Sequence, residues 1–293
     1  MKKLFVLFGL LMLILNIFAL TIVDDAGRLV TINKVPQRVV SAAPNATKFL
    51  ISLGVENTIV GVTDWDSFES EKIGNLVPLN IEKILSLNPD LVITFGGFQL
   101  PEVEKLEKFG LKVLVLNPLT LNDIAKDISL LGAIFDKMPE AKELSKKIQE
   151  KIVEFGVKSS KIPLEDRPTV FFTITTPNDE AKELWTAGTG SYINELITIA
   201  GGVNITAPYT GNNGWLPINW EFLIFNDPDV IIIATYGDPE QTLKIIKSSK
   251  IFGTLKAVKN GKILIVDGNE ISQISPDIIK YLEIFYDFFY GGN

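Results

Sequence analysis

Short apolar runs alternate with amphipathic segments along most of the chain, and this alternation predicts its secondary structure. From Thr21 to Lys34 apolar and polar residues alternate around Gly27, which predicts a small β-hairpin. Unbroken runs of apolar and β-branched residues predict buried strands at 39–40, 59–62, 91–94 and 113–116. Helical spacing predicts helices at 47–53, from residue 81, at 103–109 and at 121–134.

The second half continues the alternation. Strands are predicted at 169–173, 230–232 and 263–266, and helices at 191–200 and 275–289, with weaker helical patterns at 245–250 and 252–256. A longer helical pattern runs from Pro139 to about Lys158. Strands that alternate with helices of this length indicate an α/β fold of two lobes, each with a mainly parallel sheet flanked by helices.

One sequence pattern occurs twice, 139 residues apart. The copies are Asn80-Ile81-Glu82 with Pro89-Asp90-Leu91-Val92-Ile93, and Asn219-Trp220-Glu221 with Pro228-Asp229-Val230-Ile231-Ile232. Each copy predicts a short helix opened by Asn, a turn through Pro-Asp and a buried strand. We therefore expect two similarly built lobes that present Glu82 and Glu221 from helix N-termini. The helix dipole stabilises such a carboxylate by roughly 0.3–1 kcal/mol, which accounts for one glutamate more readily than for a matched pair.

These patterns divide the chain into four segments. Residues 1–19 are predicted to be a cleaved signal peptide, because Lys2 and Lys3 precede an apolar run and Ala19 suits a cleavage site. A retained membrane anchor is the alternative, although the run is at the short end of the roughly 20 residues that span a bilayer. We expect an N-terminal lobe at 20–137, a connecting helix at 138–162 and a C-terminal lobe at 163–293. A helical connector is stiffer than a Gly/Ser linker, so wide hinge motion is not expected.

The composition excludes several classes of function. The chain has no cysteine and no histidine, which removes disulfides, Ser-His-Asp and Cys-His catalysis, and His/Cys zinc sites. The net charge of −7 becomes −9 by side-chain count if Lys2 and Lys3 are removed, which disfavours nucleic acids and anionic membranes as partners. Acid pairs such as Asp64 and Asp66 fit solvated loops. We therefore expect no catalytic residue and no metal site.

Large aromatic residues mark a candidate ligand site. Trp65, Phe68, Phe95, Trp185 and Trp215 fall in or beside predicted loops that follow strands or precede helices. Ligands of open parallel sheets bind beyond the carboxyl ends of the strands, and aromatic side chains there suit a bulky, flat or partly apolar ligand. The alternative is that each tryptophan fills the core of its own lobe. The segment 187–191 lacks the GxGxxG spacing of a nucleotide site and fits a tight turn.

Several of these motifs together are similar to a known family. The run Arg38-Val39-Val40-Ser41-Ala42-Ala43-Pro44-Asn45-Ala46-Thr47, the run Gly61-Val62-Thr63-Asp64 and both copies of the repeat resemble the helical-backbone (class III) periplasmic binding proteins. The segment from Ala187-Gly188 to Gly201-Gly202-Val203-Asn204 resembles them as well. These proteins are the substrate-binding subunits of ABC importers for cobalamin, haem and ferric siderophores. The likeness covers essentially the whole mature chain.

The resemblance implies two α/β lobes joined by a single long helix, with the ligand held between them. It also implies that Glu82 and Glu221 dock onto arginines of the membrane permease. The aromatic residues look like those of the cobalamin-binding members, and Trp215 matches a tryptophan of their ligand site. We therefore expect a periplasmic receptor, monomeric when free and without a cofactor, that captures a cobalamin-like corrinoid for an ABC importer permease. A ferric siderophore or another iron chelate is the alternative ligand.

Two functions of other classes stay open. A carboxylate-based hydrolase would need only acidic side chains, and turnover of a small substrate would reveal it. A membrane-anchored adhesion or scaffold module would retain the N-terminal segment in the mature protein.

Overall fold

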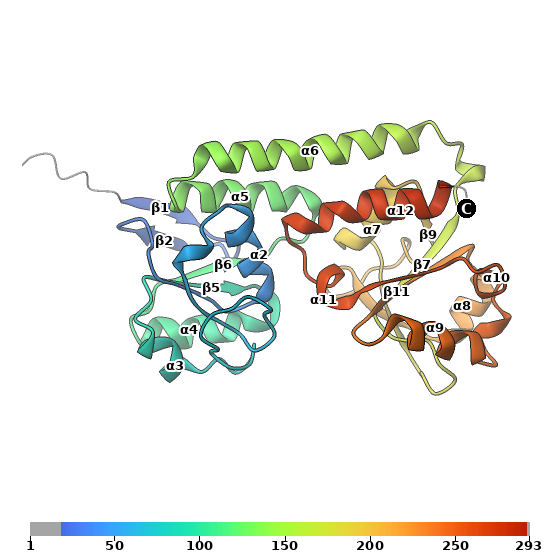
Figure 1. The fold of residues 1–293 in the computed structure, drawn as a ribbon, viewed down its shortest axis with the longest axis horizontal. Coiled ribbons are helices and arrows are strands. Elements are labelled where there is room, and N and C mark those ends of the chain that lie inside the picture. The colour runs from blue at the N-terminus through green and yellow to red at the C-terminus, as the bar shows by residue number, and fades with distance from the viewer. Residues whose placement is uncertain (1–18, 292–293) are drawn as a thin grey trace, which may run out of the picture. The chain divides into compact units, whose positions relative to one another are not determined.

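The computed structural model describes residues 19–291, which fall into two compact units (Figure 1). Unit 1 comprises residues 19–47, 54–117 and 130–138, and unit 2 comprises residues 48–53, 118–129 and 139–291. The division passes through helices α2 (Pro44–Ser52) and α5 (Leu121–Ile134). Helix α6 (Met138–Ser160) covers most of the predicted connecting segment 138–162, while the lobe boundaries at 137 and 163 stay a prediction.

The predicted signal peptide falls on residues that lie, except for Ala19, outside the described part of the chain. Within residues 19–291 no helix combines the length and the apolar character needed to cross a membrane.

Unit 1 is built around a four-stranded parallel sheet. Its strands lie side by side in the order β4 (Ile59–Val62), β3 (Val39–Ser41), β5 (Leu91–Phe95) and β6 (Val113–Leu116). Helices α3 (Ile81–Ser86) and α4 (Leu100–Lys108) pack against it through Ile84, Val103 and Leu106. Nearly every strand residue is buried, which is why these strands appear in the sequence as unbroken apolar runs.

A hairpin and two short 3₁₀ helices complete unit 1. Strands β1 (Leu20–Val23) and β2 (Leu29–Ile32) pair in antiparallel fashion, as predicted, and Gly27 supplies the positive φ of 74° in their turn. The buried carboxylate of Asp24 accepts a hydrogen bond from the Val115 amide, which fastens the hairpin to β6. The 3₁₀ helices are η1 (Glu56–Thr58) and η2 (Gly97–Gln99).

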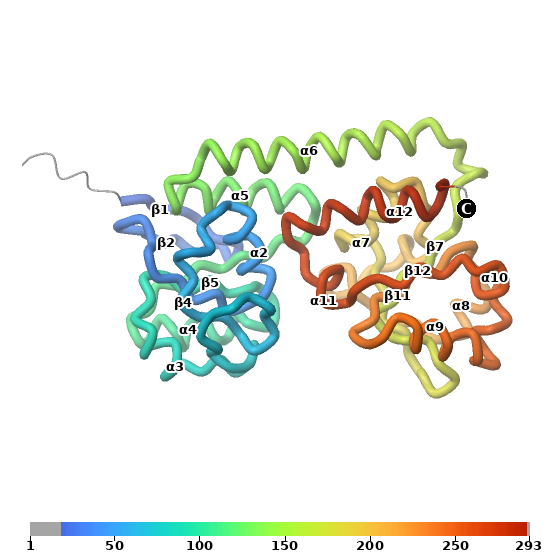
Figure 2. Tube along the Cα trace, viewed as in Figure 1, coloured from blue at the N-terminus to red at the C-terminus, as the bar shows by residue number. Residues whose placement is uncertain are grey.

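Unit 2, whose residues from 139 onward run from green to red in Figure 2, contains a second four-stranded parallel sheet. Its order is β9 (Val203–Asn204), β7 (Thr169–Thr173), β11 (Val230–Thr235) and β12 (Ile263–Asp267). Helices α8 (Trp220–Asn226) and α9 (Pro239–Ser248) contribute Leu223 and Ile246 to the core around Phe171, Ile231 and Ile233. The remaining elements are η3 (Leu164–Asp166), α7 (Tyr192–Ile199), η4 (Phe252–Thr254), α10 (Lys256–Lys259), α11 (Gly268–Ile271), η5 (Pro276–Ile279) and α12 (Lys280–Tyr290).

The two sheets share one strand order. When the strands of each sheet are numbered along the chain, both sheets read 2-1-3-4. The predicted α/β fold and the prediction of two similarly built lobes are therefore confirmed. In each sheet the order in which strands are added reverses between the first and the third strand along the chain. These two strands are β3 and β5 in unit 1, and β7 and β11 in unit 2. Ligands of open parallel sheets bind beyond the carboxyl ends of the strands at such a switch point.

One pair of strands in unit 2 corrects the sequence prediction. Residues Leu184–Ala187 and Trp215–Ile218 form an antiparallel ribbon, β8 with β10, whereas we expected loops around Trp185 and Trp215. Each strand has only four residues, and Pro217 within the second is a residue that argues against a strand. The helix expected at 245–250 also begins earlier, at Pro239, where Asp238 caps it.

Candidate functional site

Helices α3 and α8 present the two glutamates of the repeat in the same local geometry. Asn80 caps α3 by accepting the Lys83 amide at 3.0 Å, and Asn219 caps α8 by accepting the Phe222 amide at 2.9 Å. Glu82 and Glu221 therefore stand in the first turn of each helix, and both are exposed.

Neither glutamate forms an ion pair with any of the described residues. Glu221 accepts one hydrogen bond, from the side-chain amide of Asn219 at 2.9 Å, which orients its carboxylate. By contrast, exposed glutamates on other helices, such as Glu104 and Glu143, pair with a lysine one turn away. Glu82 and Glu221 are thus charged groups available to a partner. Their docking role stays a prediction.

In unit 1 the predicted aromatic residues lie at the carboxyl ends of two strands. Trp65 and Phe68 follow β4, and Trp65 is 67% exposed. Phe95 is the last residue of β5, and its ring lies 6.2 Å from the ring of Phe98. Since β3 lies between β4 and β5, the structure gathers these residues at one edge of the sheet in two separate groups.

In unit 2 the predicted tryptophans lie on the β8–β10 ribbon. Trp185 pairs with Pro217 and Trp215 pairs with Ala187, so the two tryptophans occupy diagonal positions on the same face. Trp215 is half-buried, with its ring edge-on to Phe172 at 6.1 Å and to Tyr192 at 6.4 Å. Trp185 is 44% exposed. Trp215 therefore also contributes to the core, whereas Trp185 offers a freer aromatic surface.

Buried polar atoms without a hydrogen-bond partner gather at the same edge of the unit 1 sheet. They belong to residues that end or follow strands β3 to β6: Asn45, Thr63, Asp66, Thr94 and Asn117. An unsatisfied buried polar group costs about 1–3 kcal/mol, so such groups are rare and usually have a functional or structural reason. The grouping marks this edge as a place where a ligand could supply hydrogen bonds. The expectation that Asp66 lies in a solvated loop is wrong, because its side chain is buried, whereas Asp64 is exposed as expected. Sequence analysis did not select any of the five as ligand-site residues, although their positions at strand ends were visible.

The three arginines of the chain are all engaged elsewhere. Arg28 pairs with Asp24 and Glu107, while Arg38 and Arg167 donate to backbone carbonyls of Leu87 and Ser159. Lys72, which follows the same strand as Trp65, donates its ammonium to the carbonyls of Thr63 and Asp66. The candidate site on unit 1 is therefore aromatic, with neutral polar groups and the carboxyl group of Asp66, rather than cationic.

Tyr236 is a further exposed aromatic residue that sequence analysis did not select. It directly follows β11, one of the two strands at the switch point of unit 2, and its hydroxyl lies 2.7 Å from that of Ser272. Its position directly after a buried strand was a signal that the sequence contained.

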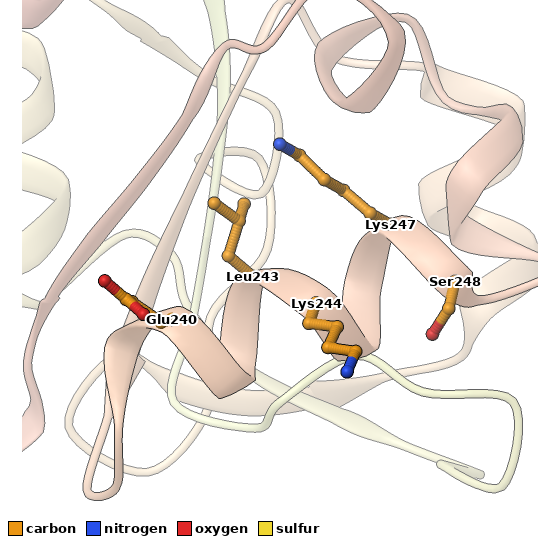
Figure 3. Close-up of a pocket in the computed structure, with 5 residues that line it drawn as sticks. All are labelled: Glu240, Leu243, Lys244, Lys247 and Ser248. Atoms are coloured by element: carbon orange, nitrogen blue, oxygen red, sulfur yellow. The ribbon is translucent and has the colours of Figure 1, made fainter.

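The surface depression on helix α9 offers no comparable chemistry. It has a volume of about 580 Å³ and is lined by Glu240, Leu243, Lys244, Lys247 and Ser248 (Figure 3). Figure 3 shows Leu243 and Lys247 on one side of the helix and Lys244 and Ser248 on the other. Because a single helix supplies every lining residue, no facing wall encloses a ligand. Within residues 19–291, no three metal-ligating side chains come together either.

Comparison with known proteins places this geometry in context. Residues 39–270 match the family model described as periplasmic binding protein. An uncharacterised ABC transporter substrate-binding lipoprotein of Bacillus subtilis is 26% identical over 92% of this chain and 84% of its own length. A cobalamin-binding protein of Halobacterium salinarum is 22% identical over 90% of this chain and 72% of its own length.

A solved structure shares the fold. The crystal structure of a periplasmic haem-binding protein from Pseudomonas aeruginosa matches with a TM-score of 0.74. The alignment covers 88% of this chain and 94% of that protein, at 22% identity. At this identity the match supports the arrangement of elements and carries no information on the ligand.

Proposed function

The chain belongs to the periplasmic binding protein family, and on that premise we propose that it captures a cobalamin-like corrinoid for an ABC importer. It is an ABC transporter substrate-binding protein of the kind that serves vitamin B12, haem and iron chelates. Its relatives are named as solute-binding proteins rather than enzymes, which agrees with a receptor that performs no chemistry. The finer assignment, to a corrinoid, rests on the side chains of the candidate site.

Aromatic side chains at the carboxyl ends of strands in unit 1 and on the β8–β10 ribbon in unit 2 carry the proposal. Trp65 and Phe95 stand at this edge in unit 1, and Trp185 presents an exposed ring in unit 2. Aromatic rings form large, rigid contact surfaces for a broad ligand at a low cost in conformational entropy. A corrin ring is such a ligand.

The polar groups of the site support a ligand rich in neutral amides. Thr94 and Asn45 are buried at this edge with side-chain atoms that no described residue satisfies. Hydroxyl and amide groups can donate to and accept from the amide side chains around a corrin. A polyanionic iron chelate would instead favour arginine, and all three arginines are bound to other groups.

An iron chelate is the second candidate, and Tyr236 is the observation that favours it. A phenol beside a strand end at the switch point could ligate or hydrogen-bond an iron complex. We rank it second because Tyr236 is the single residue that supports it.

Competitive binding tests the proposal. Purified protein without residues 1–19 would be titrated with cyanocobalamin, haemin and a ferric catecholate siderophore, each alone, while tryptophan fluorescence is followed. The cyanocobalamin complex would then be titrated with haemin and with the siderophore. The proposal predicts saturable one-to-one binding of cyanocobalamin, which the other two compounds displace weakly or not at all. Tight binding of haemin or the siderophore, together with no response to cyanocobalamin, would assign the receptor to iron.

A further inference from the structure

Helix α8 carries an apolar surface patch that the core of unit 2 does not use. The patch consists of Phe225, Ile224 and Phe222 on α8, together with Tyr209 from the segment between β9 and β10. Phe225 is 89% exposed and Ile224 is 37% exposed, whereas Leu223 between Phe222 and Ile224 is fully buried. The Phe222 ring packs edge-on against Tyr209 at 5.5 Å. A phenylalanine as exposed as Phe225 adds almost nothing to the stability of the fold.

The repeat shows that the fold does not require an apolar residue at this position. Ser86, on helix α3, is the counterpart of Phe225, and it is exposed as well. Lys83, the counterpart of Phe222, forms an ion pair with Glu71 at 2.7 Å. These two positions are therefore polar in unit 1 and aromatic in unit 2, whereas the counterpart of Ile224 is also apolar, Leu85. Local structure is alike in both units, so the difference calls for a reason outside the fold.

The patch adjoins the free carboxylate of Glu221. Glu221 and Phe225 are four residues apart in α8, so their side chains share one face of the helix. Asn219 orients the carboxylate, and no described cation neutralises it. A partner suited to this face would carry a cationic side chain next to an apolar recess.

We infer that the α8 patch is a contact surface for the permease of the importer, with Phe225 seated in an apolar recess beside a cation that pairs with Glu221. This inference rests on the importer role proposed above. Unit 2 then meets the permease through an aromatic anchor, and unit 1 meets it through the polar face of α3. Because the two contact surfaces differ in chemistry, each unit fits only one of the two positions on the permease.

A second copy of the chain fits this surface less well than the permease does. Two copies would bring together like charges, because each carries Glu221 beside its patch and a net charge of −7. The patch also has only four apolar residues, whereas a stable interface takes about 20–30 residues from each side. A larger, cationic partner surface must therefore supply the rest of the contact.

The substitution Phe225→Ser, which places the residue of unit 1 in unit 2, tests the inference. Leu164→Ser is the matched control, because Leu164 is 70% exposed on η3, away from the repeat. The partner in this test is the purified ABC importer of the source organism that binds the wild-type chain, held in lipid nanodiscs. The affinity of each variant for this importer would be measured. Each variant's melting temperature and cyanocobalamin affinity would show that its fold and ligand site are intact.

We expect Phe225→Ser to weaken binding to the importer roughly 5- to 30-fold, at low and at high salt alike, and Leu164→Ser to leave it unchanged. Equal binding by Phe225→Ser and wild type would overturn the inference, and so would an equal loss in Leu164→Ser. A dimer of the free chain that Phe225→Ser abolishes would identify a second copy as the occupant instead. If the wild-type chain binds no importer at all, the proposed function itself fails, and this inference fails with it.

Discussion

Asp229 and Thr169 are joined by three hydrogen bonds at the amino end of the sheet in unit 2. The Oδ2 atom of Asp229 accepts from the Thr169 amide at 2.8 Å and from its hydroxyl at 2.6 Å, and that hydroxyl accepts from the Asp229 amide at 3.0 Å. In unit 1 the carboxylate of Asp90 accepts from the amides of Gln37 and Arg38 in the same way. The Pro-Asp half of the repeat therefore fastens neighbouring strands. Within residues 19–291, by contrast, neither Glu82 nor Glu221 bonds to a neighbouring strand, and Glu221 accepts only the hydrogen bond from Asn219.

Replacing Asp229 by alanine should destabilise the protein. The change leaves the Thr169 amide without its acceptor, so we expect the free energy of unfolding to fall by about 1–2 kcal/mol at pH 7. Urea denaturation measures this value. Asp64→Ala is the control, because the Asp64 side chain is exposed and accepts no hydrogen bond from described residues; its effect should stay within about 0.5 kcal/mol.

The cost of the Asp229 substitution should depend on pH. Burial acts to raise the pKa of Asp229, but hydrogen bonds from Thr169 and Lys256 outweigh it and hold the pKa below its usual value. The stabilisation is therefore present above the pKa of about 4 of an unfolded aspartate, and it is lost as the pH falls through the lower pKa of the folded state. A penalty that is the same at pH 7 and pH 2.5 would contradict this assignment.

Removal of both repeat glutamates should separate docking from ligand capture. We expect the Glu82→Ala, Glu221→Ala double variant to lose at least about tenfold in affinity for the importer, because two charge-assisted contacts disappear. Ligand affinity should stay within about twofold, since neither residue belongs to the aromatic site. The control replaces Glu104 and Glu143, which are also exposed but pair with lysines. Unchanged transport by the Glu82/Glu221 variant would refute the docking role.

The two tryptophans of the ribbon should behave differently when truncated. Trp185→Ala should weaken ligand binding roughly tenfold and lower the melting temperature less than Trp215→Ala does, because Trp185 is 44% exposed whereas Trp215 is half-buried. Trp215→Ala should lower both the ligand affinity and the melting temperature, because its ring packs on Phe172 and Tyr192. Phe109→Ala serves as the control, since Phe109 is exposed and precedes β6 rather than following a strand. Equal affinity for wild type and Trp185→Ala would exclude Trp185 from the site.

Glu195 should make the protein less stable as the pH rises. Burial raises the pKa of Glu195, the charge of Asp123 raises it further, and the hydrogen bond from the Leu121 amide offsets only part of this. The raised pKa means that protonated Glu195 favours the folded state. This stabilisation is fully present below the pKa of an unfolded glutamate, and it is lost as the pH rises through the higher pKa of the folded state. Glu195→Gln keeps an acceptor for Leu121 and removes the charge.

We therefore expect Glu195→Gln to be more stable than wild type at pH 8 and equal to it near pH 3.5. The gain should stay below about 1 kcal/mol, because solvent screens this half-buried group. Thermal unfolding at both pH values measures it. A variant less stable than wild type at pH 8 would show that the ionised carboxylate is the better acceptor.

The sequence predicted the secondary structure well where strands are buried on both faces and where a helix has a regular apolar pattern. Strands 59–62, 113–116 and 169–173 and helix 121–134 occur at the predicted residues, because strands covered on both faces leave unbroken apolar runs and α5 keeps a clear helical period. The β8–β10 ribbon was missed because its strands are short and contain Pro217. The start of α9 could have been found, since Asp238 followed by Pro239 is a helix-start signal.

The candidate site was only partly accessible to sequence analysis. The aromatic residues were selected by their place after apolar runs, and for Trp65 and Phe95 that reasoning agrees with the structure. Whether Thr94 and Asn45 have hydrogen-bond partners depends on neighbours far along the chain, so no local pattern reveals it. The ligand-binding and docking roles of all these residues stay predictions.

Calorimetric titration of the chain from Leu20 onward with cyanocobalamin tests the central claim most directly. We predict saturable binding at one corrinoid per chain, accompanied by a change in tryptophan fluorescence, and weaker binding by Trp185→Ala. No heat and no fluorescence change with cyanocobalamin, alongside saturable binding of a ferric chelate by the same preparation, would contradict the corrinoid assignment.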